Sequence, residues 1–201
     1  MISLFYSVCA IALLLVLFFS SKEDIRYHRI SKKYVILCFI IVLTYNNIIG
    51  GTIEATISFI FTLGLFSAFT FLSRGGFGFG DSLILGAIGW FIGNLRYLQY
   101  YFIVLGFCML LLSAYFIIKN HKQNGKGLKN FFIKTTLVNI NELKPGMILA
   151  DDYFMKGVTE KEIDELKKKN ITTVMVKQAY PFIPVIFLSF LIYTIGYLAV
   201  L

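Results

Sequence analysis

Residues 75–93 read GGFGFGDSLILGAIGWFIG and hold a single carboxylate, Asp81, among residues that are otherwise apolar, small or hydroxylic. A helix needs about 20 mostly apolar residues to cross a bilayer core of ~30 Å. Residues 82–93 are too few for this, but the segment reaches spanning length when it begins near Gly75. The stretch therefore predicts a membrane span that carries Asp81 just inside the membrane edge.

The rest of the chain also has the composition of a membrane protein. Of its 201 residues, 58% are hydrophobic and only 15% are charged, whereas soluble domains are about 45–50% apolar and about 25% charged. The apolar residues form long blocks without a regular polar face. Besides 75–93, the blocks that predict spans are 2–20, 34–49, 53–72, 97–118 and 183–200. We therefore expect an all-α polytopic membrane protein with six transmembrane helices.

The basic residues predict which side of the membrane each loop faces. With six spans and the N-terminus outside, the inside segments are 21–33, 73–81 and 119–182, and these hold every basic residue except Arg96. This is the bias of the positive-inside rule. The net charge of +8 is therefore a topology signal. It favours contact with an anionic inner leaflet and does not require nucleic-acid binding.

The polar segment between the last two spans predicts a small α+β insertion on the cytoplasmic side. TTLVNI, ILADDY and ITTVMVK have the composition of short strands. TEKEIDELKKKN predicts a helix with a capping box between Thr159 and Glu162. The expected organisation is helices 1–5 in residues 1–118, the insertion in 119–180 and helix 6 in 181–201.

The cysteines predict neither a disulfide framework nor a metal site. Cys9, Cys38 and Cys108 all lie in apolar blocks, and the chain has no CxxC pair. We therefore expect three small buried side chains.

A second acid, Asp24, follows the first predicted span. An even number of crossings separates Asp24 from Asp81, so both face the same compartment near the membrane boundary. Two adjacent carboxylates can activate a water and protonate a peptide carbonyl, as aspartyl proteases do. The helix dipoles favour Asp81 as the base and Asp24 as the holder of the shared proton. Gly78 and Gly80 would let the backbone bend and a substrate strand approach.

Each acid also has a plain interpretation that the residues alone leave open. Asp24 could be a solvated acid paired with Arg26 or Arg29. Asp81 could be a helix N-cap, a position that Asp favours. An ionisable residue at membrane depth is nevertheless a functional candidate.

These residues resemble the motifs of the type IV prepilin peptidases and preflagellin peptidases, which are GxGD-type intramembrane aspartyl proteases. DIRYHRIS, beginning at Asp24, is similar to the family's Asp, basic residue and Ile-Pro pattern, with Ser31 in place of the Pro. GFGD, ending at Asp81, matches GxGD, although Leu83 stands where many members have Lys. PFIP at 181–184 resembles the entry to the family's last helix. The motif residues of this chain are Asp24, Arg26, Arg29, Gly78, Gly80, Asp81, Pro181 and Pro184.

The resemblance implies an endopeptidase that removes the short basic leader of pilin-like or flagellin-like precursors. It would cut after a Gly at the cytoplasmic face of the plasma membrane, with Asp24 and Asp81 as the catalytic pair and without a metal or organic cofactor. The longer bacterial members have an N-terminal region with cysteines and also methylate the new N-terminus. This chain begins at the first span, so a peptidase without methyltransferase activity is expected.

Three other kinds of protein stay open. A presenilin-type protease would have Tyr-Asp and Pro-Ala-Leu motifs, but here Glu23 precedes Asp24 and no Pro-Ala-Leu occurs. A non-enzymatic scaffold of a pilus or secretion assembly would need neither aspartate. A small transporter would show internal repeats with broken helices, and the sequence has one glycine-rich segment only.

Overall fold

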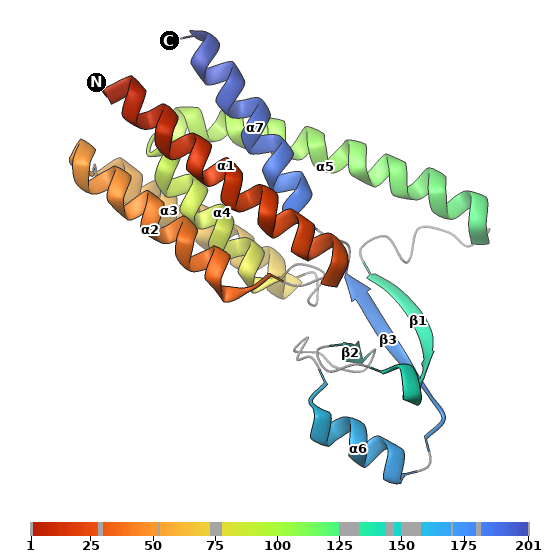
Figure 1. Cartoon of the computed structure of the whole chain (residues 1–201). Coiled ribbons are helices and arrows are strands. Elements are labelled where there is room, and N and C mark those ends of the chain that lie inside the picture. The colour runs from red at the N-terminus through yellow and green to blue at the C-terminus, as the bar shows by residue number, and fades with distance from the viewer. Residues whose placement is uncertain are drawn as a thin grey trace.

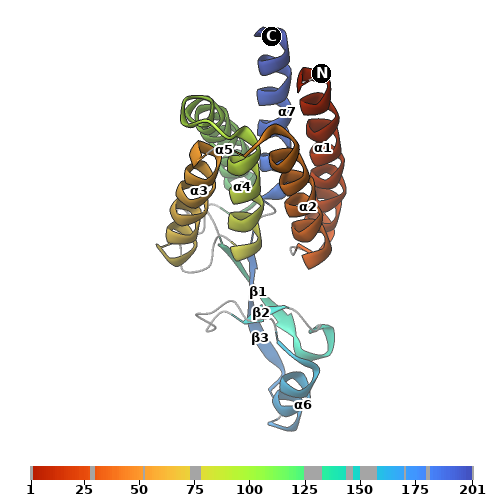
Figure 2. The same cartoon turned by 90° about the vertical axis from the view of Figure 1, so that its left-hand side faces the viewer.

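The computed structural model describes residues 2–27, 30–51, 53–72, 78–124, 133–143, 147–149, 158–169, 171–179 and 182–200. The chain forms a bundle of apolar helices, with a smaller unit of strands and one helix at one end of it (Figures 1 and 2). The bundle contains α1 (Ile2–Tyr27), α2 (Lys32–Ile49), α3 (Ile53–Leu72), α4 (Phe79–Ile92), α5 (Leu95–Asn124) and α7 (Ile183–Val200).

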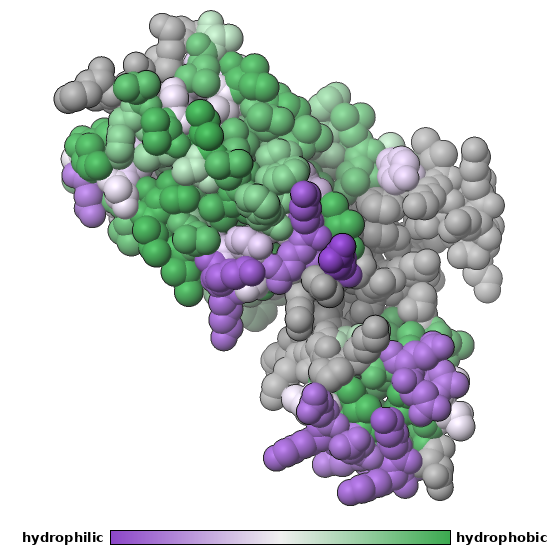
Figure 3. All heavy atoms as spheres, viewed as in Figure 1, coloured by the Kyte–Doolittle hydropathy of each residue, from purple (hydrophilic) through white to green (hydrophobic). Residues whose placement is uncertain are grey.

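The helices of the bundle have the character of membrane spans. Among the described residues, four helices, α1, α2, α3 and α5, are long and apolar enough to cross a bilayer. The face of the bundle seen in Figure 3 is largely apolar, and hydrophilic residues gather on it at the end that faces the strands. The protein is therefore a membrane protein with a predominantly helical fold.

The other two apolar helices of the bundle, α4 and α7, are not among these four. α4 has 14 described residues, which corresponds to about 21 Å at 1.5 Å per residue. Residues 75–77 of the predicted span lie outside the described residues, and Gly78 has an extended conformation, so the described helix begins at Phe79. Six spans therefore stay a prediction.

Helix α4 occupies an enclosed position. It packs between α2 and α3 (Figure 2), and ten of its 14 residues are buried. Its sequence explains this, because apolar and small side chains surround the helix on all sides. The carboxylate of Asp81 is thereby carried into the protein interior.

Helices α3 and α4 pack through small residues that bring their backbones close together. A Cβ atom added at Gly89 would lie 2.9 Å from Cβ of Thr62 and 3.0 Å from the carbonyl oxygen of Ser58. One added at Gly86 would lie 3.3 Å from Cβ of Leu63. Small residues commonly allow such close approach between membrane helices. We call this contact the α3–α4 seam.

The bundle core joins helices that are distant in sequence. Tyr6 of α1 stacks on Phe91 of α4 with ring centroids 5.0 Å apart, and it lies 4.8 Å from the ring of Tyr197 of α7. Aromatic contacts of this kind contribute about 0.5–1.5 kcal/mol beyond area burial. The three cysteines are buried and free, as predicted.

The smaller unit is an α+β module that follows α5 and precedes α7 in the chain. Its elements are β1 (Ile133–Asn139), the 3₁₀ helix η2 (Ile140–Glu142), β2 (Ile148–Leu149), α6 (Glu160–Lys168) and β3 (Thr173–Ala179). The strands form an antiparallel sheet in the order β1-β3-β2. A separate apolar cluster supports the sheet: Ile140, Leu143, Val158, Ile163 and Val176.

The local predictions for this module are confirmed where the structure describes it. The backbone N–H of Thr159 donates to the Glu162 carboxylate at 2.7 Å, and the N–H of Glu162 donates to Oγ1 of Thr159 at 3.4 Å. This is the predicted capping box. Of the strand predicted from ILADDY, the first two residues form β2, and the rest lies outside the described residues.

Two helices run beyond the ends predicted for them. α1 ends at Tyr27 and not at residue 20, and α5 ends at Asn124 and not at 118. The added residues are mostly polar but contain neither Gly nor Pro, so nothing in them interrupts the helical backbone. The hydrophobic blocks mark where the apolar surface stops, not where the helix stops. Asp24 therefore lies within α1, although it follows the first predicted span.

Candidate active site

Asp24 lies near the C-terminal end of α1 and faces the interior of the bundle. The buried face of this helix passes through Leu13, Leu17 and Ser20 to Asp24, at the three- and four-residue intervals of one helix face. The side chain of Asp24 is only 5% exposed. The continuation of this period beyond the apolar block is the signal that assigns Asp24 to the interior.

The Asp24 carboxylate binds the N-terminus of another helix. Its Oδ2 accepts a hydrogen bond from the backbone N–H of Ile183 at 3.0 Å, and the backbone of Phe182 also donates to the carboxyl group. The first N–H groups of a helix have no partner within that helix. Asp24 therefore caps α7, which begins 159 residues later in the chain.

Asp81 lies in the first turn of α4 and is also buried. Its Oδ2 accepts a hydrogen bond from the backbone N–H of Gly78 at 3.1 Å. Gly78 has an extended conformation, and a Cβ atom added to it would lie 3.1 Å from the same Oδ2. A glycine at this position therefore gives the carboxylate room to fold back onto the backbone.

Gly80 has a milder packing role. A Cβ atom added there would lie 3.4 Å from Cδ1 of Ile30, at the edge of ordinary van der Waals contact. Of the two motif glycines, Gly78 is therefore the one whose lack of a side chain bears directly on the Asp81 carboxylate.

The structure brings the two aspartates to the same end of the bundle. α1 ends and α4 begins at the end nearest the strands (Figure 1). The two side chains lie close enough that the charge of Asp24 acts on Asp81. Two buried acids with interacting charges favour a state in which one is protonated and the other is ionised.

The predicted roles of the two acids rested on the dipole of the helix that carries each of them, with Asp24 at the unfavourable C-terminal end of α1. The structure adds the N-terminus of α7 to Asp24, so both carboxylates now accept a backbone hydrogen bond at a helix start. The dipoles no longer distinguish a base from an acid.

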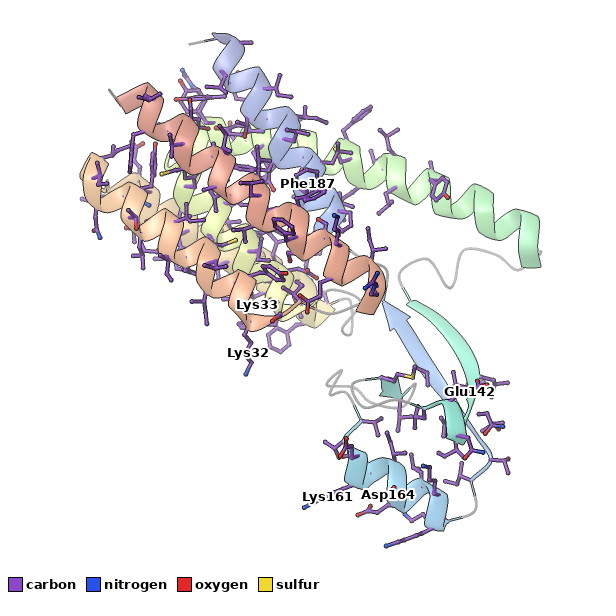
Figure 4. All side chains as sticks on the ribbon, in the orientation of Figure 1. Lys32, Lys33, Glu142, Lys161, Asp164 and Phe187 are labelled. Atoms are coloured by element: carbon purple, nitrogen blue, oxygen red, sulfur yellow. The ribbon has the colours of Figure 1, made fainter. Side chains whose placement is uncertain are left out.

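The remaining motif residues are placed less closely. Arg26 is exposed on α1, and Pro184 is half-buried at the second position of α7, where a proline suits the first turn of a helix. Arg29 and Pro181 lie outside the described residues. Lys32 and Lys33 are exposed at the start of α2, at the same end of the bundle (Figure 4).

A model of the type IV leader peptidase family matches residues 11–120. The chain belongs to this family. The protein is therefore a peptidase of the leader-peptidase type, and family membership implies prepilin-like substrates in general terms. Comparison with curated proteins and with solved structures gave no match.

The family match covers both aspartates and the GxGD motif but stops before the module and α7. The backbone N–H of Ile183 is thus a contact to a motif residue that sequence reasoning did not identify. Pro184 carried a usable signal, because a proline in the first turn marks a helix start. Counting the predicted spans then places the start of α7 on the same side of the membrane as Asp24.

The donor to Asp24 can be tested by Ile183→Pro. Proline is tolerated at the first helical position, so the change removes the N–H that reaches Asp24 while α7 can still form. A hydrogen bond to a charged group contributes about 1.5–3 kcal/mol, so we expect leader-peptidase activity to fall about tenfold or more. Activity is measured per amount of folded enzyme.

The matched control is Ile183→Ala, which keeps the N–H and also loses the buried isoleucine side chain. If both variants lose the same amount of activity relative to the wild type, the loss comes from the side chain and not from the hydrogen bond to Asp24.

Proposed function

We propose that this leader peptidase is a membrane-embedded aspartyl endopeptidase in which Asp24 and Asp81 are the catalytic pair. Its substrate would be a pilin-like or flagellin-like precursor, with a short basic leader, a Gly at the cleavage point and a hydrophobic helix after it. The reaction would take place at the cytoplasmic membrane face and would use water and the two acids.

The main support for this proposal is the environment of the two acids. The two acids of the motif-bearing helices are both buried, yet each has a backbone hydrogen bond, and their charges interact. Burying one acid in an apolar bundle is costly, and burying two near one another is more so. A solvated loop acid or a simple helix cap would not need the second carboxylate.

The chemistry follows from a proton shared between the carboxyl groups. The ionised carboxylate draws a proton from a water, whose oxygen attacks the peptide carbonyl carbon at the cleavage point. The protonated carboxyl group donates to the carbonyl oxygen. The tetrahedral intermediate then collapses: the carboxyl group that took the proton from water gives it to the leaving nitrogen, one hydroxyl of the intermediate returns a proton to the other carboxylate, and the C–N bond breaks. The backbone N–H groups of Ile183 and Gly78 would orient the two carboxylates during these steps.

The arrangement in the membrane is part of the same proposal. The N-terminus would lie outside, six helices would cross the plasma membrane, and the unit at 119–180 would form a cytoplasmic domain between the segments 1–118 and 181–201. Lys32 and Lys33, exposed near the site end (Figure 4), would face the headgroups of an anionic inner leaflet. Such exposed charges contribute individually small energies.

The test is cleavage of a panel of prepilin-like precursors by sealed membrane vesicles that contain the protein. Inverted vesicles expose the cytoplasmic face, so we expect them to cut an added precursor. Right-side-out vesicles should cut it only after detergent is added. Mass spectrometry of the products should place the cut directly after the Gly that precedes the hydrophobic helix.

Other outcomes would contradict specific parts of the proposal. A cut within the hydrophobic helix would favour a presenilin-type protease. Equal cleavage in both vesicle orientations would overturn the proposed topology. Membranes that contain folded protein but cleave no member of the panel would favour the scaffold interpretation.

A further inference from the structure

The turn of α4 that carries Asp81 has few side chains to hold it in place. Gly78 and Gly80 have none, and the side chain of Phe79 is 58% exposed. Within the described residues, the Asp81 carboxylate accepts a hydrogen bond from the backbone N–H of Gly78, which belongs to the same turn. A catalytic acid has to be held within about 0.5 Å of its productive position. Another group should therefore fix this turn.

Ser82, the residue directly after Asp81, is fully buried and reaches across to α3. Its hydroxyl oxygen lies 3.1 Å from Oγ1 of Thr70, and the Thr70 hydroxyl is also within hydrogen-bond distance, 3.0 Å, of the carbonyl oxygen of Phe66. When Thr70 donates its proton to that carbonyl, Ser82 donates to Thr70. The two hydroxyls then connect the α4 turn to the backbone of α3.

The contact between Ser82 and Thr70 lies at the end of the α3–α4 pair that carries Asp81. Ser82, Gly86 and Gly89 are spaced as residues on one face of α4, and the two glycines form the α3–α4 seam. The seam fixes the distance between the helices further along their length. The hydroxyl pair fixes the end at which Asp81 lies.

We propose that Thr70 is a positioning residue for Asp81. Its hydroxyl holds Ser82 and thereby sets the orientation of the first turn of α4. The inference rests on the proposed function, in which Asp81 acts on the substrate. Thr70 itself touches neither substrate nor water in this proposal, so its removal changes the turnover number and leaves substrate binding as it is.

The test compares kcat and KM for precursor cleavage in Thr70→Val, Ser82→Ala and the double variant. Thr70→Val keeps the shape of the side chain and removes the hydroxyl. We expect kcat to fall about three- to tenfold for each single variant, as the loss of one hydrogen bond predicts, with KM within about twofold of the wild type. Because the two hydroxyls act as one contact, the double variant should be no slower than the slower single variant.

Two further variants separate positioning from a general structural role. Thr70→Ser restores a hydroxyl and should recover most of the lost kcat. Thr44→Val is the matched control, because Thr44 donates to the carbonyl oxygen of Ile40 at 2.8 Å in the same way, on an exposed part of α2. It should leave kcat unchanged. All rates are given per amount of folded enzyme, and thermal unfolding is used to check that each variant is folded.

Each alternative outcome has a defined meaning. A kcat of Thr70→Val equal to that of the wild type, additive losses in the double variant, or an equal loss in Thr44→Val would overturn the inference. Asp24→Asn and Asp81→Asn are run alongside. If these are inactive while Thr70→Val is normal, the positioning role alone fails. If they remain active, the proposed function fails and the positioning role with it.

Discussion

Asp24→Asn and Asp81→Asn are each expected to lower precursor cleavage by roughly 10²- to 10⁴-fold, the usual contribution of a general acid or base. Asparagine keeps an oxygen that can accept the hydrogen bond from Ile183 or Gly78, so the fold should survive. It cannot exchange a proton with the substrate or with water. The measurement is the initial rate of cleavage at equal amounts of membrane-inserted enzyme.

The stability of the same variants provides an internal check. Each substitution replaces a buried ionisable group by a neutral one, which removes a cost of burial. The variants should therefore unfold at the wild-type temperature or above it. An inactive variant that is also less stable would point to a structural role for the acid.

Asp164→Asn is the control for these substitutions. Asp164 is exposed on α6 in the module, away from the aspartate pair (Figure 4), and its substitution should leave the rate unchanged. Cleavage that survives either Asp24→Asn or Asp81→Asn would exclude the two-acid mechanism.

Gly89→Ala is expected to destabilise the bundle by about 1–3 kcal/mol, the usual effect of overpacking. The new Cβ atom would lie 3.0 Å from the carbonyl oxygen of Ser58 and closer still to the side chain of Thr62. The two helices would have to separate along the α3–α4 seam. Gly89→Leu should prevent accumulation of folded protein.

The chain contains its own reporter for this separation. Trp90 is the only tryptophan, and its ring centroid lies 5.2 Å from that of Phe59 on α3. Thermal unfolding followed by tryptophan fluorescence should show a lower midpoint for Gly89→Ala. A change in the emission spectrum of the folded variant would accompany the separation.

Gly64→Ala is the matched control, because Gly64 is also within a helix and a Cβ atom there would meet nothing within 4 Å. It should be neutral or slightly stabilising. Thr62→Ala combined with Gly89→Ala should recover part of the loss, since it removes the Thr62 hydroxyl oxygen, the atom nearest to the new Cβ. The Thr62 hydroxyl has no hydrogen-bond partner among the described residues, so its own removal should cost little. Equal midpoints for Gly89→Ala and Gly64→Ala would contradict the close packing of the seam.

Much of the architecture could be predicted because it depends on near neighbours in the chain. Long apolar blocks predicted the membrane helices, and a Thr and a Glu three residues apart predicted the cap of α6. Helix ends were less predictable, because polar residues such as Lys22 and Arg26 end an apolar surface without ending a helix. The interior position of Asp24 was within reach of the sequence, since the helical period of α1 continues to it.

The sequence by itself predicted that two acids, on different helices, face the same side of a membrane, because that prediction depends only on the parity of the spans. The tertiary structure decided what each acid contacts. Ile183 reaches Asp24 across 159 residues, and Ser82, beside Asp81, meets Thr70 on the neighbouring helix. Such contacts depend on how helices are rotated and shifted against one another. Hydropathy along the chain leaves that rotation undetermined, whereas close packing of side chains fixes it.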